Sequence, residues 1–304
     1  MAASLSIRTV GVSRRAHAFW ALAKPRIVGL LLVTTVPAMI LAANGLPSGW
    51  LVLATVAGGA LAAGGANALN CYLDRDIDAV MRRTRRRPLP AHDVEPAQAL
   101  VFGVGLSVAG VSLLAMAVNP LSAALTAGAN LFYVLVYTVW LKRRTPQNIV
   151  IGGAAGAVPP MVGWAAVTGR VDLPAVLMFG IVFLWTPLHF WALSLRYEDD
   201  YRAAAVPMLP VTEGRDETTR RMLRYAVALA AISVALVPAG GLGPLYGAVA
   251  VGLGAMVVAH AAVLRRTRDP GAEVRVFKRS NVYLAALFVA IAADVLVRSA
   301  VGRT

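Results

Sequence analysis

The sequence predicts an all-α membrane protein, a bundle of nine transmembrane helices arranged as two four-helix halves plus one. Three observations predict this fold class: the apolar composition, a regular succession of long apolar runs, and the gathering of charge into alternate loops. Of the 304 residues, 58% are apolar and only 14% are charged, whereas soluble domains average about 45–50% and about 25%. The composition therefore excludes an ordinary soluble globular protein.

Nine apolar runs are each long enough to cross a membrane. A transmembrane helix needs about 20 predominantly apolar residues to span a hydrocarbon core of roughly 30 Å, and continuous runs of this length are helical because lipid offers no partners to unpaired backbone groups. We place a transmembrane domain at 27–301 and a cytoplasmic N-terminal segment at 1–26. The first run is too long for a cleavable leader. The runs cover residues 27–44, 50–71, 97–117, 121–140, 147–167, 174–195, 222–239, 243–264 and 282–301.

Charge divides the loops into two classes. Of the 29 Lys and Arg residues, 26 lie before the first run, in every second loop after it, or at the edge of such a loop, and only Arg170, Arg298 and Arg303 lie on the other side. By the positive-inside rule, this predicts a multi-pass protein of the plasma membrane with a cytoplasmic N-terminus. A net charge of +14 is also typical of nucleic-acid binding. In so apolar a chain it indicates a membrane surface, and we expect no nucleic-acid partner.

The acidic residues lie on the same side as the basic ones. Two long loops, 72–96 and 196–221, are dense in both carboxylate and arginine and stand four spans apart. This spacing predicts two four-helix halves of the same topology, followed by a ninth helix. The single cysteine, Cys71, excludes an internal disulfide and a cysteine-based zinc site.

The first acidic loop begins with a set of hard oxygen ligands. Asn70, Asp74 and Asp78 are spaced four apart, so on one continuous helix they fall within an arc of about 80°. An amide oxygen and two carboxylates on a shared face suit Mg²⁺, whose remaining positions phosphates and water fill. The arginine run that follows, with Arg82 and Arg86, would neutralise a diphosphate. The alternative is a solvated loop that only follows the positive-inside rule.

The second acidic loop repeats the pattern just past the run 174–195. Asp199 and Asp200, followed by Tyr201, would face the first loop across the bundle, and two facing acidic sites would hold a diphosphate between two Mg²⁺ ions. His189 lies within the run, where an ionisable residue is a functional candidate. It would ligate or hydrogen-bond a planar cofactor, or bond to a neighbouring helix as a neutral histidine.

A third basic loop enters the glycine-containing run 147–167. Lys142, Arg143 and Asn148 stand at this entrance, where they would lie near an anion. Close packing of helices through the small residues that follow would explain the glycines alone.

At these motifs the sequence resembles the UbiA-type intramembrane prenyltransferases. The resemblance rests on the Asn-x-x-x-Asp-x-x-x-Asp motif at 70–78 and the Arg-Thr-x-x-Arg-Pro-Leu-Pro stretch at 83–90. Within the family it is most similar to the members that join a farnesyl chain to haem. Further matching segments, which extend the resemblance to roughly residues 20–295, lie at 24–26, 147–153, 163–169, 189–193, 199–201 and 206–210.

This resemblance implies a Mg²⁺-dependent transferase. Farnesyl diphosphate would be held through Mg²⁺ and would ionise to an allylic cation, which a vinyl group of haem B attacks before water adds. The implied partners are farnesyl diphosphate, haem B, the lipid bilayer and a haem A synthase. The implied catalytic and metal-binding residues are Asp74, Asp78, Asp199 and Asp200, with Asn70 as a further metal ligand. The implied substrate-binding residues are Asn70, Arg82, Arg86, Lys142, Arg143, Asn148, His189 and Tyr201.

Some features leave room for other interpretations. Tyr133, Tyr137 and Trp185 would stabilise positive charge or serve as membrane-interface aromatics. The chain departs from the family pattern at Ala205, where glycine is expected, and at Leu188, where proline is frequent. Two other functions are transfer of the prenyl group to an aromatic quinone precursor, and transport, since Gly- and Pro-interrupted spans are typical of transporters. A transporter, however, would place charge near the membrane midplane.

Overall fold

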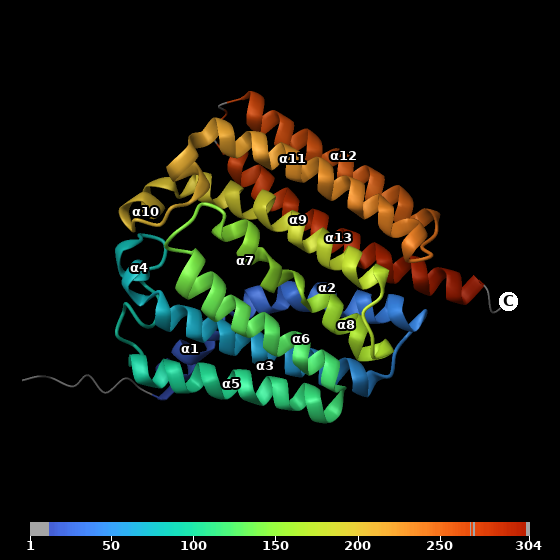
Figure 1. The fold of residues 1–304 in the computed structure, drawn as a ribbon, viewed down its shortest axis with the longest axis horizontal. Coiled ribbons are helices and arrows are strands. Elements are labelled where there is room, and N and C mark those ends of the chain that lie inside the picture. The colour runs from blue at the N-terminus through green and yellow to red at the C-terminus, as the bar shows by residue number, and fades with distance from the viewer. Residues whose placement is uncertain (1–11, 268, 270, 302–304) are drawn as a thin grey trace, which may run out of the picture.

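A computed structural model describes residues 12–267, 269 and 271–301, and every regular element in these residues is a helix. Long helices run side by side between two ends of the molecule (Figure 1). The short helices α4 and α10 lie together at one end, and the α8–α9 and α11–α12 turns lie at the other. The elements are α1 Val12–Ala23, α2 Pro25–Ala43, α3 Gly49–Leu73, α4 Arg75–Val80, α5 Pro96–Ala117, α6 Pro120–Leu131, the π-helix η1 Phe132–Leu141, α7 Asn148–Ala157, α8 Pro159–Thr168, α9 Leu173–Arg196, α10 Glu198–Ala203, α11 Leu209–Ala239, α12 Pro244–Arg266 and α13 Ala272–Val301.

Eight of the described helical segments are long and apolar enough to cross a membrane, with α6–η1 and α7–α8 each counted as one. They match eight of the nine predicted runs. The remaining run, 27–44, corresponds to α2, in which Val33–Ala43 is the described apolar stretch. Helices α11 and α13 begin at Leu209 and Ala272, earlier than their apolar runs, because charged turns continue the same helices. The protein is therefore a multi-pass helical membrane protein.

Proline and capping side chains set where the helices begin. Proline lacks the amide hydrogen that the first helical turn leaves unpaired, so it is favoured there. Asn119 caps α6 by accepting a bond from the Ser122 amide (2.8 Å). Buried Asp294 accepts bonds from the amides of Gly243 and Tyr246 (2.7 and 3.1 Å) at the start of α12. The helices that begin with proline are α2, α5, α6, α8 and α12, at Pro25, Pro96, Pro120, Pro159 and Pro244.

Helices α3 and α5 approach closely because their glycines face one another. A Cβ atom at Gly65 would lie 2.6 Å from the Gly103 carbonyl oxygen, and one at Gly110 would lie 2.5 Å from the Gly58 carbonyl oxygen. Helices α2 and α8 meet in the same way at Gly163, where a Cβ atom would lie 2.4 Å from a carbonyl oxygen of α2. Close van der Waals packing through small residues is a main source of helix association in lipid.

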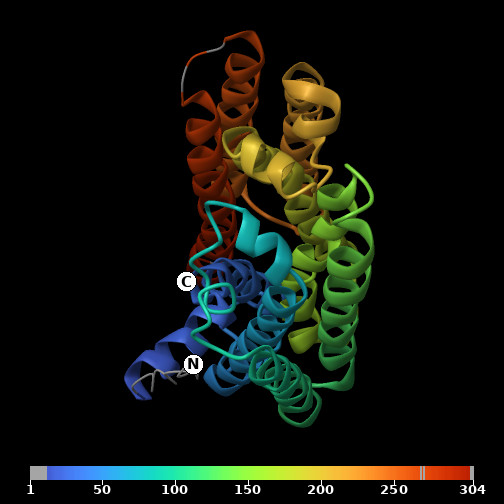
Figure 2. The same ribbon diagram turned by 90° about the vertical axis from the view of Figure 1, so that its left-hand side faces the viewer.

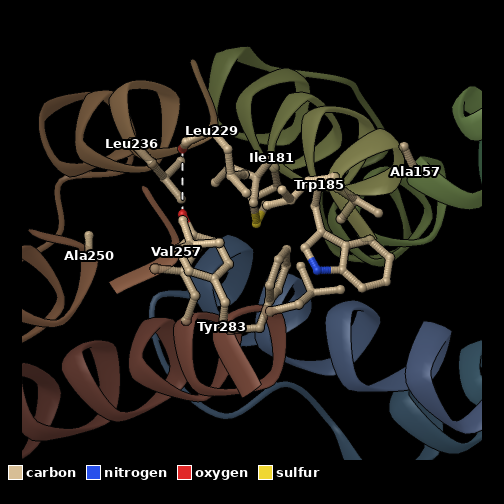
Figure 3. Close-up of a cluster of buried hydrophobic side chains, with 14 of the residues drawn as sticks. Ala157, Ile181, Trp185, Leu229, Leu236, Ala250, Val257 and Tyr283 are labelled. Carbon is tan, nitrogen blue, oxygen red and sulfur yellow. Dashed lines mark hydrogen bonds between the residues drawn. The ribbon is translucent and has the colours of Figure 1, made fainter. Parts of the chain in front are cut away.

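Larger side chains fill the space between α9, α11, α12 and α13. Figure 3 shows this cluster, in which Tyr283 of α13 reaches toward Leu229 of α11 and the Trp185 ring lies beside them. The Tyr283 hydroxyl shares a hydrogen bond with Ser233 Oγ (2.7 Å), and the Tyr246 hydroxyl donates to the Ser233 carbonyl oxygen (2.9 Å). These bonds satisfy the buried hydroxyls and tie three helices together.

Two spans depart from regular α-helix inside the bundle. Phe132–Leu141 is a π-helix, and the α7–α8 span is interrupted at Val158, immediately before Pro159. Interrupted helices are tolerated at membrane depth where the backbone lines a cavity, and π-helical turns are frequent at functional sites. Both irregular segments line the cavity described below.

The acidic loops meet at one end of the bundle. Figure 2, which views the molecule from that end, shows α4 and α10 lying across it near one another. Ile77 of α4 and Tyr201 of α10 belong to the same buried apolar cluster, together with Met81, Ile149 and Met208. The two loops, more than a hundred residues apart in sequence, thus form a single cap over the helix ends.

Candidate functional site

A cavity of about 350 Å³ lies among α2, α3, the α6–η1 span, the α7–α8 span and α9. This volume is near the lower end of the range of about 300–1,000 Å³ that is typical of small-molecule sites. Its walls combine small residues with the aromatic rings of Tyr133, Tyr137, Trp185 and Phe190, and none of the described residues that line it carries a formal charge. Tyr133 and Tyr137 stack with their ring centroids 5.4 Å apart. The cavity is suited to an apolar ligand.

A buried polar network joins three segments of the chain at Asn70 and Asp74. Asn70 Nδ2 donates to Asp74 Oδ2 (2.7 Å) and to Thr138 Oγ1 (3.2 Å). Asn70 Oδ1 accepts a bond from Lys24 Nζ (2.9 Å). Lys142 forms an ion pair with the same Asp74 oxygen. A fully buried carboxylate is thus held by one amide and one ammonium group.

This network lies at the end of the cavity. Asn70 follows the lining residue Asn67 by less than one helical turn, and Thr138 directly follows the lining residue Tyr137. Asp74 Oδ1 is buried and has no hydrogen-bond partner. Because an unpaired buried carboxylate oxygen is costly, this atom is suited to receive a further ligand.

The first acidic loop does not continue α3 as one helix. The helix ends at Leu73, whose carbonyl oxygen accepts a bond from the Arg143 guanidinium (3.1 Å), and Asp74 has φ −92° and ψ 7°. The prediction of a continuous helix through Asp78 is therefore wrong. Asp78 instead stands on α4, where both of its carboxylate oxygens accept bonds from Arg87 Nη1 (3.0 and 2.8 Å). Asp74 and Asp78 are nevertheless both buried.

The arginines of this region take different roles from one another. Arg87, the second arginine of the Arg-Thr-x-x-Arg-Pro-Leu-Pro stretch, pairs with Asp78, whereas Arg86 is exposed and has no ion pair in the described part of the chain. Arg143 makes two bonds of 2.7 Å to the carboxylate of Asp76. These bonds are the main reason that the pKa of Asp76 is lowered to about 2. In this structure Arg143 therefore binds Asp76 of α4 and is not among the residues that line the cavity.

The two carboxylates of the second loop lie in different environments. Asp200 is buried and accepts bonds from Arg82 Nε (3.0 Å) and the Arg83 amide (3.1 Å), both in the first loop. Burial acts to raise the pKa of Asp200, but the bonds from Arg82 and the backbone outweigh it and lower the pKa. The Asp199 side chain is 81% exposed and lies 3.7 Å from Arg202. Only Asp200 therefore faces the first loop.

Tyr201 and Asn148 support the loops from within. Tyr201 is buried in the same apolar cluster as Ile77 of α4 and Ile149 of α7, so it fills space between the two acidic loops and the end of α7. Asn148 is also buried, and its Nδ2 donates to the Thr145 carbonyl oxygen (2.6 Å). The Oδ1 atom of Asn148 has no partner. Neither residue is hydrogen-bonded to Asn70 or Asp74 in the described part of the chain.

His189 lies on the cavity wall, between two aromatic rings. Its ring centroid is 4.2 Å from that of Trp185 and 4.4 Å from that of Phe277. Its Nδ1 lies 2.9 Å from Ser280 Oγ on α13. The histidine therefore bonds to a neighbouring helix, as one of the two alternatives expected, and its place on the cavity wall leaves contact with a ligand as a prediction.

Lys24 is a site residue that motif spacing did not identify. It connects α1 to α2 with φ 51° and ψ 59°, a left-handed conformation that is rare for a residue with a side chain. Burial is the main cause that lowers the pKa of its ammonium group. The sequence signal was a Lys-Pro pair immediately before the first apolar run, where Pro25 starts a helix and turns the lysine back toward Asn70.

Each buried carboxylate of the two acidic loops has a cationic partner. The pairs are Asp74 with Lys142, Asp78 with Arg87 and Asp200 with Arg82. Across the described residues, no three Asp, Glu, His or Cys side chains are grouped as a ready metal site. The geometry therefore places oxygen donors and cationic side chains at the end of an apolar cavity, an arrangement that would accept an anionic head group on an apolar chain.

Comparison with known families and proteins gives a consistent result. The model of the UbiA prenyltransferase family matches residues 31–290. The protoheme IX farnesyltransferase of Parafrankia sp. (strain EAN1pec) is 51% identical over 292 residues, which cover 95% of this chain and 93% of that protein. The protoheme IX farnesyltransferase of Frankia casuarinae is 53% identical over 291 residues, covering 94% of this chain and all of that protein.

Solved structures of low sequence identity share the fold. A digeranylgeranylglyceryl phosphate synthase has a TM-score of 0.77 at 16% identity, covering 93% of this chain and 99% of that one. A UbiA homolog from Archaeoglobus fulgidus bound to GPP and Mg²⁺ has a TM-score of 0.61 at 13% identity, covering 91% and 99%. The helical arrangement is therefore that of these membrane proteins.

Proposed function

Because the chain belongs to the UbiA prenyltransferase family, we propose that it transfers a farnesyl group from farnesyl diphosphate to a vinyl group of protohaem IX, haem B, and so makes haem O. The observation that carries this proposal is about 50% identity to protoheme IX farnesyltransferases along nearly the whole chain. An uncharged aromatic cavity that ends at a cluster of carboxylates and lysines is consistent with a substrate that has an apolar chain and a diphosphate head.

In this proposal the cations at the cavity mouth bind the diphosphate. Lys24, Lys142 and Arg87 are each partly or largely withdrawn from solvent and already hold Asn70 or a carboxylate. A diphosphate that binds here is negatively charged, and each of these side chains has further N–H groups that can donate hydrogen bonds to its oxygens. Their attraction is stronger here than at an exposed surface because the surroundings screen charge poorly.

The chain's oxygen donors also fit Mg²⁺. Asp74 Oδ1 is buried without a partner, and hard oxygen ligands from one or two carboxylates are what this ion prefers. We place the ion at Asn70, Asp74 and Asp78, with Asp200 of the second loop opposite. Asp199 is not included, because its side chain is exposed to solvent. When bound, Mg²⁺ would neutralise charge on the departing diphosphate. A structural relative was solved with GPP and Mg²⁺.

The reaction breaks the C1–O bond of farnesyl diphosphate, and the electron pair leaves with the diphosphate. The π electrons of the haem vinyl group then form the new C–C bond, and water adds to the resulting cation and loses a proton. Tyr133 and Tyr137 stack at the end of the cavity nearest the carboxylates. Their ring faces would stabilise the allylic cation, and Gly152 leaves room for them, since a Cβ atom there would lie 2.2 Å from the Tyr137 ring.

We further propose the topology in the membrane. Counting α2, the bundle has nine spans in two four-helix halves plus one, with domain limits at 27–301 and a cytoplasmic segment at 1–26. The basic and acidic loops at the α4 and α10 end face the cytoplasm of a plasma-membrane protein, by the positive-inside rule. A haem A synthase is the partner that would receive the product.

Product analysis tests the function directly. Purified protein is incubated with haem B, farnesyl diphosphate and Mg²⁺, and haem O is measured by mass spectrometry, with a chelator and an aromatic quinone precursor as parallel reactions. We expect haem O only with the metal present and no prenylated quinone precursor. Prenylation of the quinone precursor in preference to haem would overturn the proposed acceptor, and full turnover of Asp74→Ala or Asp78→Ala would overturn the metal assignment.

A further inference from the structure

His189 is held in one orientation by contacts on both faces and on one edge. Its ring lies between Trp185 of its own helix and Phe277 of α13, with interplanar angles of 17° and 28°. The indole Nε1 of Trp185 donates to the Ser280 carbonyl oxygen (2.7 Å), which fixes the same two helices together. A stacked ring that is also bonded at one edge has little freedom to turn.

The hydrogen bonds of Ser280 indicate which nitrogen of His189 carries the proton. Ser280 Oγ lies 2.8 Å from the Phe277 carbonyl oxygen, which can only accept, so this bond takes the single hydroxyl hydrogen. The same Oγ lies 2.9 Å from His189 Nδ1, and both bonds form together when Nδ1 carries the proton and donates to Oγ; we assign this tautomer. In the neutral ring Nε2 is then unprotonated and has a lone pair.

The Nε2 atom has no hydrogen-bond partner within the described part of the chain, and His189 lines the cavity. No charged side chain shares the described cavity wall, so nothing there favours the imidazolium form. A neutral imidazole with one N–H satisfied by an outer-sphere acceptor and the other nitrogen open is the arrangement found in histidine ligands of metals. If His189 instead donated a hydrogen bond from Nε2, for example to a carboxylate of the substrate, the proton would have to be on Nε2 and not on Nδ1.

We propose that His189 Nε2 is an axial ligand of the iron of the haem substrate, and that Ser280 is the positioning residue that fixes its tautomer. This inference rests on the proposed function, since it takes haem as the acceptor. Iron ligation would orient the porphyrin in the cavity before its vinyl group meets the farnesyl cation. The ligand class is thus a metalloporphyrin, recognised through its metal.

Absorption spectroscopy of the purified full-length protein in nanodiscs tests the inference. Haem B is titrated into the wild type, His189→Phe, His189→Gly and Ser280→Ala, and metal-free protoporphyrin IX is titrated into the same set. His189→Phe keeps an aromatic ring between Trp185 and Phe277 but has no nitrogen. His260→Phe is the matched control, because His260 is also within a span and bonds through Nδ1, to the Met256 carbonyl oxygen (2.8 Å).

If His189 ligates the iron, its removal should weaken the binding of haem but not that of metal-free porphyrin. We expect His189→Phe to lose the Soret band of nitrogen-ligated haem and to bind haem at least about tenfold more weakly, while its affinity for metal-free porphyrin changes by less than a factor of about two. Added imidazole should restore the band in His189→Gly. Ser280→Ala should weaken haem binding by roughly tenfold, and His260→Phe should match the wild type.

An unchanged haem band and affinity in His189→Phe would overturn the inference. Equal weakening of haem and metal-free porphyrin, without rescue by imidazole, would also overturn it and would assign His189 a packing role. Haem O formation by the wild type is measured in parallel, so the two failures are distinguishable. If the wild type makes haem O but the spectra of the variants are unchanged, only the inference of iron ligation by His189 fails. If the wild type makes no haem O, the proposed function itself is contradicted.

Discussion

The two acidic loops have similar composition but place their carboxylates differently. In the first loop, Asp74 and Asp78 are both buried, and each is paired with a cation. In the second, Asp200 is buried whereas the neighbouring Asp199 has 81% of its side chain exposed. Both loops are rich in acidic residues, but the first loop contributes two buried carboxylates and the second contributes one.

Spacing explains the difference. Residues four apart in a helical turn lie on the same side, whereas adjacent residues point about 100° away from each other. Asp74 and Asp78 therefore both turn inward even though α3 breaks between them, while only one of Asp199 and Asp200 can do so. The second loop contributes one carboxylate and uses it to hold the first loop through Arg82 and Arg83.

The largest expected effect is a difference in activity between variants of a buried carboxylate, Asp74, and an exposed one, Asp199. Asp74→Asn should lower kcat/KM for haem O formation by about 10²- to 10³-fold, the usual cost of losing one group that stabilises developing charge. Asp199→Asn should stay within about a factor of two of the wild type, because the side chain is exposed. Mass spectrometric assays of product formation at several substrate concentrations make the comparison.

A control for folding is needed because Asp74→Asn leaves Lys142 without its ion pair. The double variant Asp74→Asn/Lys142→Met removes both charges, so it should recover thermal stability but not activity. Recovery of activity as well would mean that the Asp74 carboxylate serves only to balance the lysine. Equal losses of activity in Asp74→Asn and Asp199→Asn would contradict the distinction between the buried carboxylate of the first loop and the exposed one of the second.

The next effect concerns the link between the loops. Asp200→Asn removes the charge that binds Arg82 and the Arg83 amide, so the segment that follows α4 should become more mobile. We expect trypsin to cut this arginine-rich segment about tenfold faster than in the wild type, since cleavage follows the population of the opened form. Arg202→Gln, which removes the partner of Glu198 and Asp199, is the matched control and should leave the cleavage rate unchanged.

A smaller effect lies in the backbone of the second loop. Ala205 has φ 52°, a left-handed conformation that costs a non-glycine residue about 1–2 kcal/mol. Ala205→Gly should therefore raise the free energy of unfolding by roughly 0.5–1 kcal/mol after the added entropy of the unfolded chain is subtracted. Thermal unfolding measures the change. Ala204→Gly, at φ −87°, should not stabilise, and a gain there equal to that at Ala205 would contradict the strain argument.

The smallest effect concerns Asp76, an exposed carboxylate of the first loop. The Arg143 guanidinium holds the pKa of Asp76 at about 2, below its usual value of 3.8. A carboxylate with a lowered pKa in the folded state stabilises the fold above its unfolded pKa, and this stabilisation is lost as the pH falls from about 4 to about 2. Asp76→Asn should be less stable than the wild type at pH 7 and nearly equal to it at pH 2, in thermal unfolding. A stability difference that stays the same from pH 7 to pH 2 would contradict this account of Asp76.

Several features of the fold were predictable from local sequence. Eight predicted spans match helices of sufficient length and apolarity, and the predicted ends of α5 and α9 lie within about one residue of those observed. The family resemblance from the 70–78 motif is confirmed by the family match. The break at Asp74 was not predictable from local sequence, since the Leu73 carbonyl oxygen accepts its bond from Arg143, 70 residues further along the chain in the loop after η1.

The sequence by itself determined the class of protein, the spans and the residues that carry charge. About 20 consecutive apolar residues suffice to place a helix in the hydrocarbon core, and this property is local to each segment. Tertiary structure decided which charges meet. Lys142 and Asp74 are 68 residues apart, and Arg82 and Asp200 are 118 apart. Whether a carboxylate is buried, paired or exposed depends on how the helices assemble around it, and that assembly is set by packing across the whole bundle.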